Sequence, residues 1–306
     1  MRIHGMSLVK NEADVIRQSL VAAAEWADAI YVYDNGSDDD TWTIVQELTT
    51  TYPQIVLYKQ EARPFGESLR GELFTRYRAE PGDWWVTLDA DEFYIDDPRT
   101  FLGAIPERFG EVWSASFEYY FTDRDVARYE HEPAAYADDV PVGDKFRYYV
   151  NNWSEPRFFR DTKRVRWDEG DAWPEGLGAA YHERIRLKHY QYRSPPQMQR
   201  RIDSRRGALE RSFRHELLPD WEHVILNPRE VDFAAADMAY APTTWRERVV
   251  DASLLTEDRG NYVVDEAALP PIPRGWPAWV TSMRAGARRV KNLVARRSGW
   301  RRWRPD

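Results

Sequence analysis

Cysteine is absent from the sequence, which excludes disulfides, thiolate nucleophiles and cysteine-ligated zinc. This absence is typical of a cytoplasmic protein. Long apolar runs are missing as well, because residues 20–33, the best candidate, contain Glu25 and Asp28, so no membrane-spanning segment is expected. The first twenty residues contain Glu12 and Asp14 and lack the apolar centre of a signal peptide, so we do not expect export by that route.

The residues that are present predict a folded protein with an uneven charge distribution. With 306 residues, of which 42% are hydrophobic and 14% aromatic, the chain can form one large or two ordinary domains around a sizeable core. The net charge of −8 combines a basic carboxyl-terminal tail with an acidic body, since residues 1–283 contain 34 basic and 50 acidic residues. An acidic body argues against a broad nucleic-acid footprint, so nucleic acid is not an expected partner.

Apolar runs alternate with helical patterns through the first third of the chain. The pattern predicts strands at residues 2–9, 29–33, 55–58 and 84–88, and helices at residues 12–27, 41–50 and 67–78. This alternation predicts an α/β fold in which a mostly parallel central sheet is flanked by helices. Because ligands bind at the carboxyl ends of the strands in such sheets, the side chains after strands two and four are the first functional candidates.

Acidic clusters follow both of these strands, in "DNGSDDD" (residues 34–40) and "DADE" (residues 89–92). Asp89 and Asp91 are two residues apart, so in an extended chain their side chains can point the same way. Such a pair suits Mn²⁺ or Mg²⁺, which also takes oxygens from a substrate diphosphate, although the spacing equally fits a solvated acidic turn. The last three aspartates of the first cluster fit a helix start, which leaves Asp34 as its functional candidate.

Three segments carry a family resemblance: "MSLVKNEADVIRQSL", "IYVYDNGSDDDT" and "WWVTLDADEFY", in this order. They resemble the nucleotide-binding half of family 2 glycosyltransferases with the A-type (GT-A) fold, in the branch with N-E, D-N-G-S and D-x-D-E-F motifs. The resemblance covers about residues 1–125 and is thinner from there to about residue 205. Asp38 and Asp40 stand where the family more often has Thr and Gly, at positions that fit a helix start.

The resemblance implies roles for four acidic residues. Glu12 and Asp34 would recognise the nucleoside of a nucleotide-sugar donor. Asp89 would face the ribose or the diphosphate, and Asp91 would hold Mn²⁺ or Mg²⁺. The metal would offset the charge of the diphosphate and stabilise the nucleotide as it leaves.

Histidine is scarce, with six residues in the chain. His189 lies in "RLKHYQYRSPPQMQRR", near the end of a predicted strand, where related transferases often place a residue that completes the metal site. His182 is the alternative ligand, and a purely structural role for His189 is equally open. Glu92 alternates away from the aspartate pair and is interpreted as a residue that supports it.

A transferase that inverts the sugar also needs a general base near the acceptor hydroxyl. The resemblance places an acid in the acceptor half, where "VRWDEGDAW" offers one of Asp168, Glu169 and Asp171. The tryptophans of this segment could stack on a sugar, but the segment could also be an exposed acidic turn beside core tryptophans. Asp123 and Glu155 are competing candidates.

The later part of the chain is predicted more coarsely. We expect a strand at 112–122, a polar loop at 123–144 that binds ligands or covers the site, short strands within 146–167, a strand at 185–190 and a helix at 196–213. The expected organisation is a GT-A domain at residues 1–213, with a nucleotide-sugar half at 1–125 and an acceptor half at 126–213. A helical extension at 214–277 and a basic amphipathic tail at 278–306 follow.

The tail has two interpretations. Apolar residues at helical spacing, tryptophans and many arginines predict a helix that lies on the inner face of a membrane and brings the enzyme to a lipid-linked acceptor. The tail could instead pack against the acidic body.

Taken together, these patterns predict a metal-dependent glycosyltransferase that moves a sugar, with inversion, onto a hydroxyl of a glycan, lipid-linked or macromolecular acceptor. One alternative is a catalytically silent sugar- or nucleotide-binding protein on the same fold. A nucleotidyltransferase is a weaker alternative, because such enzymes typically have a glycine-rich basic segment after strand one, where this chain has "VKNEADV".

Overall fold

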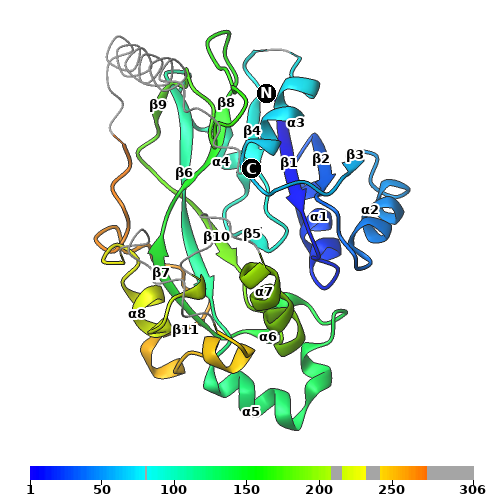
Figure 1. The fold of residues 1–306 in the computed structure, drawn as a ribbon. Helices are drawn as coiled ribbons and strands as arrows, with labels where there is room; N and C mark the ends of the chain where they lie inside the picture. The colour runs from blue at the N-terminus through cyan, green and yellow to red at the C-terminus, as the bar shows by residue number, and fades with distance from the viewer. Residues whose placement is uncertain (80, 208–215, 232–241, 274–306) are drawn as a thin grey trace, which may run out of the picture.

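A computed structural model describes residues 1–79, 81–207, 216–231 and 242–273 (Figure 1). Its amino-terminal part is a parallel sheet with the strand order β3-β2-β1-β4. The strands are β1 (Ile3–Val9), β2 (Ala29–Asp34), β3 (Ile55–Gln60) and β4 (Trp84–Thr87), and the helices between them are α1 (Ile16–Ala24), α2 (Thr41–Thr49) and α3 (Leu69–Tyr77). All seven elements were predicted from the sequence, and these predictions are confirmed.

The sheet continues beyond β4 as a mixed sheet. The order is β4-β8-β6-β7-β11, with β8 (Pro156–Arg160) antiparallel to both neighbours, then β6 (Phe109–Tyr119), β7 (Tyr148–Trp153) and β11 (Thr256–Glu257). Further pairings involve β5 (Glu92–Tyr94), β9 (Ala179–Ala180) and β10 (Ile185–His189). β10 is parallel to β6 and antiparallel to β5. The predicted parallel arrangement therefore holds for the amino-terminal part, and the acceptor half is mixed.

The prediction of a loop at residues 123–144 is wrong. This stretch forms α5 (Asp123–His131), the 3-10 helix η1 (Pro133–Tyr136) and α6 (Val142–Lys145). α5 forms because Thr122 and Asp125 make a capping box, in which each side chain bonds the other residue's backbone N–H. None of these residues lines the main cavity described below, so the stretch does not cover it.

The remaining helices within the described residues are α4 (Pro98–Gly103), α7 (Pro195–Gly207) and α8 (Trp221–Leu226), with the 3-10 helices η3 (Trp245–Arg248) and η4 (Ala252–Leu254). Asp97 caps α4 by accepting from the Thr100 N–H at 2.7 Å. Of the described parts of the extension, 216–231 and 242–273, the second joins the sheet because β11 pairs with β7. The tail at 278–306 lies outside the described residues.

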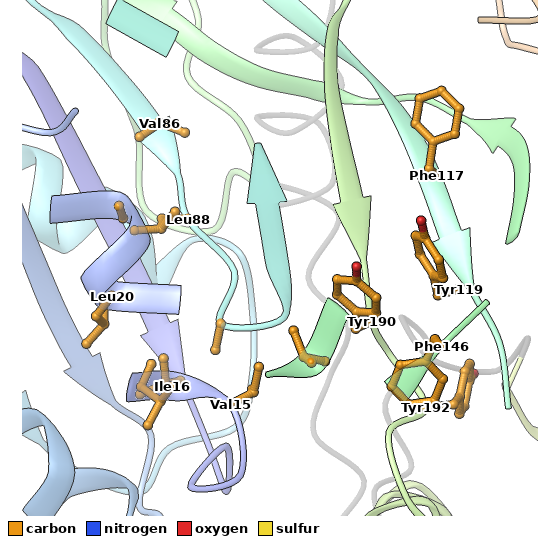
Figure 2. Close-up of a cluster of buried hydrophobic side chains, with 14 of the residues drawn as sticks. Val15, Ile16, Leu20, Val86, Leu88, Phe117, Tyr119, Phe146, Tyr190 and Tyr192 are labelled. Atoms are coloured by element: carbon orange, nitrogen blue, oxygen red, sulfur yellow. The ribbon is translucent and has the colours of Figure 1, made fainter. Parts of the chain in front are cut away.

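Two apolar cores form on the two faces of the parallel sheet. β1 is buried along its whole length, since both of its faces are covered. On one face α1 packs Val15, Ile16 and Leu20 into a core that extends to β6 and β10, as Figure 2 shows. On the other face α3 packs against β1, β2 and β4. Among the described residues, no helix is long and apolar enough to cross a membrane.

Candidate active site

A cavity of about 660 Å³ opens where β1 and β4 end. Its wall on the side of the parallel sheet contains Lys10, Asn11, Glu12, Asn35, Arg70, Asp89 and Asp91. Its other wall comes from the ends of β6, β7 and β10 and from α7 and α8, and contains Glu118, Trp153, Glu155, His189, Arg200 and Trp221. In Figure 1, α7 lies beside the end of β10, between α8 and the amino-terminal strands. Residues from both halves of the chain therefore line the cavity.

The "NE" and "DNGS" segments are bonded to each other at this edge. The Asn11 N–H donates to Oγ of Ser37 at 2.9 Å, and the side-chain oxygen of Asn11 accepts from the Asp38 N–H at 2.9 Å. The Glu12 N–H donates to Oγ1 of Thr41 at 2.8 Å. Asn11 has a φ of 58°, a left-handed conformation that asparagine tolerates better than most residues. These polar residues hold the two loops as one unit.

Asp34 and its neighbours shape the second loop. Asp34 is fully buried, and its Oδ1 accepts from the Ser37 N–H at 2.7 Å, while its Oδ2 has no hydrogen-bond partner among the described residues. Asn35 lines the cavity and exchanges two hydrogen bonds with the backbone of Arg63, at 2.9 and 3.0 Å. Gly36 has a φ of +78°, and a Cβ there would lie 2.6 Å from that of Ala62. Asp34 thus lies behind the wall of the cavity.

Asp91 and His189, the two predicted metal ligands, lie next to each other. β10 places His189 opposite Glu92 of β5 and opposite Glu118 of β6. Nε2 of His189 lies 3.3 Å from Oδ1 of Asp91, and its Nδ1 lies 2.9 Å from Oε2 of Glu118. Burial lowers the pKa of His189, but the carboxylates of Glu118 and Asp91 outweigh it and hold this pKa well above its ordinary value. Burial raises the pKa of Asp91, but His189 and Arg193 outweigh it and the pKa is lowered.

These two residues fit part of a divalent metal site. Among the described residues, no group of three or more acidic or histidine side chains could hold a metal ion alone. The 3.3 Å between Nε2 of His189 and Oδ1 of Asp91 suits two neighbouring ligands of an ion with bond lengths of about 2.1 Å. Mn²⁺ and Mg²⁺ usually take their other ligands from water and substrate phosphates. Glu118 on Nδ1 would then leave Nε2 for the ion.

Asp89 holds two arginines. One oxygen accepts from Arg70, and the other lies 2.8 Å from Nη1 of Arg157. Burial raises the pKa of Asp89, but these two cations outweigh it and the pKa is lowered. Arg157 also binds Glu92 and, at 2.6 Å, Glu155. Asp89 therefore orients guanidinium groups at the edge of the cavity, and Glu92, predicted to support the aspartate pair, binds Arg157, which also contacts Asp89.

Arg193 is a site residue that the sequence did not reveal. Its side chain is buried, binds Glu12, and lies 2.7 Å from Asp14 and 3.5 Å from Asp91. Burial is the main cause that raises the pKa of Glu12 to about 7, although Arg193 opposes it. A single arginine four residues after His189 carries no pattern that marks it. The structure shows that it joins the "NE" loop to the "DADE" edge.

The predicted bases lie apart from the cavity. Asp168, Glu169 and Asp171 belong to a turn outside its lining, where Nε1 of Trp167 donates to the Asp171 carbonyl at 2.8 Å and the indole packs on Phe74 and Phe159. Asp123 begins α5, and His182 is likewise outside this lining. Of the competing candidates, Glu155 lines the cavity, with 37% of its side chain exposed.

A comparison with protein-family models identifies the family of the chain. A family model described as glycosyl transferase family 2 matches residues 8–176. No curated protein matches the chain. Similar solved structures include TarS from S. aureus (16% identity, TM-score 0.31, covering 40% of this chain and 36% of that chain) and the mannosyltransferase PcManGT from Pyrobaculum calidifontis (20%, 0.30, 42% and 37%). Another is glucosyl-3-phosphoglycerate synthase from Mycobacterium tuberculosis (18%, 0.28, 52% and 56%). The chain spans little more than a third of the first two structures.

Proposed function

The chain belongs to glycosyl transferase family 2, and we propose that it transfers a sugar from a nucleotide-sugar donor to a hydroxyl of a glycan, lipid-linked or macromolecular acceptor, with inversion. The observation that carries this proposal is the meeting of the "NE", "DNGS" and "DADE" segments with His189 around one cavity. The cavity volume of about 660 Å³ lies within the range of small-molecule sites.

The side of the cavity formed by the parallel sheet would bind the donor. Glu12 and Asn35 line it, and buried Asp34 holds the loop behind them. Asp91 and His189 would hold Mn²⁺ or Mg²⁺, which would neutralise diphosphate charge and stabilise the leaving nucleotide. Arg70, oriented by Asp89, adds a guanidinium group that can bind a diphosphate oxygen.

Glu155 is our candidate for the general base. It lies just before β8, at the same edge of the sheet as Asp89, and Arg157 binds both residues. The Glu155 carboxylate would accept the proton of the acceptor hydroxyl as its oxygen attacks the anomeric carbon. The bond from that carbon to the diphosphate oxygen breaks on the opposite face, and the nucleotide leaves with the electron pair. Every other acid that lines the cavity has closer or more numerous cationic partners or is more deeply buried.

A thermal-shift panel tests the donor and metal assignments together. UDP, GDP, dTDP and CDP are each added with and without Mn²⁺ to the wild type, Asp91→Asn and the matched variant Asp168→Asn, whose aspartate lies outside the cavity. We expect Mn²⁺-dependent stabilisation by one nucleotide, lost in Asp91→Asn and kept in Asp168→Asn, because binding to the folded state raises its stability. No stabilisation of the wild type by any nucleotide would contradict the proposal. Stabilisation without sugar transfer would favour a silent binding protein.

A further inference from the structure

The cavity wall formed by α7 is rich in arginine. α7 contributes Arg200, Arg201, Ser204 and Arg205 to the lining, and we call these four residues the α7 wall. Glu216 lies 2.7 Å from Nε of Arg201 and 3.4 Å from Nε of Arg205. Among the described residues, the α7 wall presents three guanidinium groups, two of which lie beside the Glu216 carboxylate.

Arg200 is the member of this wall that is best placed to meet a ligand. Its side chain is exposed, and no carboxylate of a described residue lies within ion-pair distance of it. Ser204 follows four residues later, which places its hydroxyl on the same face of the helix. A guanidinium fork beside a hydroxyl matches the oxygens of a phosphate or carboxylate.

The position of the α7 wall indicates the acceptor side. The loops proposed to bind the donor supply cations of their own, since Lys10, Arg63 and Arg70 line that part of the cavity. The pairing of Arg201 with Glu216 joins α7 to the segment that leads into α8. The same half of the cavity contains Glu155 and the indole of Trp153, which is 41% exposed. An acceptor that fits here can meet charge on one wall and an aromatic face on another.

We propose that the α7 wall is a subsite for an anionic group of the acceptor, a phosphate or a carboxylate, separate from the place of the donor diphosphate. This inference rests on the proposed function, because it assigns the substrate class of the same cavity. It predicts that neutral saccharides are poorer acceptors than saccharides or other hydroxyl compounds that carry a phosphate or carboxylate.

The test uses inorganic phosphate as the probe and the full chain as the protein. Binding of the nucleoside diphosphates with Mn²⁺ is measured first, and the best of them is then kept at saturation so that the donor side is filled. Titration calorimetry at constant ionic strength then measures the binding of phosphate to this filled protein. We expect phosphate to bind the filled protein, and Arg200→Gln to weaken this binding by about 10-fold, the loss of one charge-assisted hydrogen bond. Arg206→Gln is the matched control, since Arg206 is exposed on the same helix but does not line the cavity.

Three results would overturn the inference. Phosphate that binds the protein alone but is displaced by the nucleoside diphosphate would mean that the α7 wall serves the donor. Equal weakening by Arg200→Gln and Arg206→Gln would mean general attraction to a basic helix. No phosphate binding, with nucleoside diphosphate binding intact, would remove the anionic subsite and leave the proposed function standing. If none of the nucleoside diphosphates binds, that separate result counts against the proposed function.

Discussion

Glu12 places an ionisable group in the cavity wall at a cost in stability. Burial is the main cause that raises its pKa from an ordinary 4.5 to about 7. Between these two pH values the unfolded chain has released the proton while the folded protein still holds it, so the stability falls as pH rises through this window. The two pKa values differ by about 2.5, which at about 1.4 kcal/mol per pKa unit gives roughly 3 kcal/mol of lost stability by pH 8.

The substitution Glu12→Gln removes this ionisation and keeps the shape of the side chain. We expect its free energy of unfolding to be close to that of the wild type at pH 5 and roughly 3 kcal/mol higher at pH 8. Urea unfolding followed by tryptophan fluorescence at pH 5, 6, 7 and 8 measures the difference. Glu25→Gln is the control, since Glu25 is exposed at the end of α1. A wild type that is more stable than Glu12→Gln at pH 8 would refute the reasoning, because the bond to Arg193 would then outweigh burial.

Two more substitutions address the site. Glu118→Gln should weaken Mn²⁺ binding by about 10- to 100-fold, because the partner on Nδ1 orients His189 and increases its basicity. Mn²⁺ titration followed by electron paramagnetic resonance measures the affinity, with Glu130→Gln, at an exposed position of α5, as control. Equal affinities of the two variants would exclude this role of Glu118. Glu155→Gln should lower sugar transfer by about 100-fold or more while nucleoside diphosphate binding persists. Sugar transfer that is kept in Glu155→Gln but lost in Asp168→Asn would mean that the general base is Asp168 in the acidic turn.

The sequence predicted the parallel part of the fold because its signals there are local. β1 and β4 are fully buried strands, so they read as apolar runs, and α1 shows one apolar stripe that is indeed buried. The Asp34 loop and Asp91 reach the same cavity because β2 and β4 are parallel strands that end at the same edge of the sheet. Nothing local indicates that β8 inserts between β4 and β6, since these pairings join residues about 70 and 50 positions apart in the chain.

The partners of the site residues escaped prediction for the same reason. Arg193 meets Asp14 across 179 residues, and Arg157 meets Asp89 across 68. A single sequence gives no sign of such pairs, because the residues that surround these arginines in the sequence do not differ from those around an arginine on an exposed helix. The base was assigned to an acidic turn near tryptophans, and in the structure those tryptophans belong to the core on the α3 face. Glu155 was a competing candidate from the sequence, and it is preferred only once β8 is placed beside β4.

The part of the cavity formed by α7 and α8 comes from a separate stretch of the chain. The donor side lies within residues 8–176, the stretch that the family model matches, whereas α7 and α8 follow it. Asn152 of β7 joins the two stretches, since its amide donates to the Ile225 and Leu226 carbonyls at the end of α8. The part of the cavity that α7 and α8 form is therefore encoded outside the stretch that contains the proposed donor loops. Under the proposed function, we expect an insertion, deletion or exchange beyond β10 to alter the choice of acceptor without changing the loops proposed to bind the nucleotide.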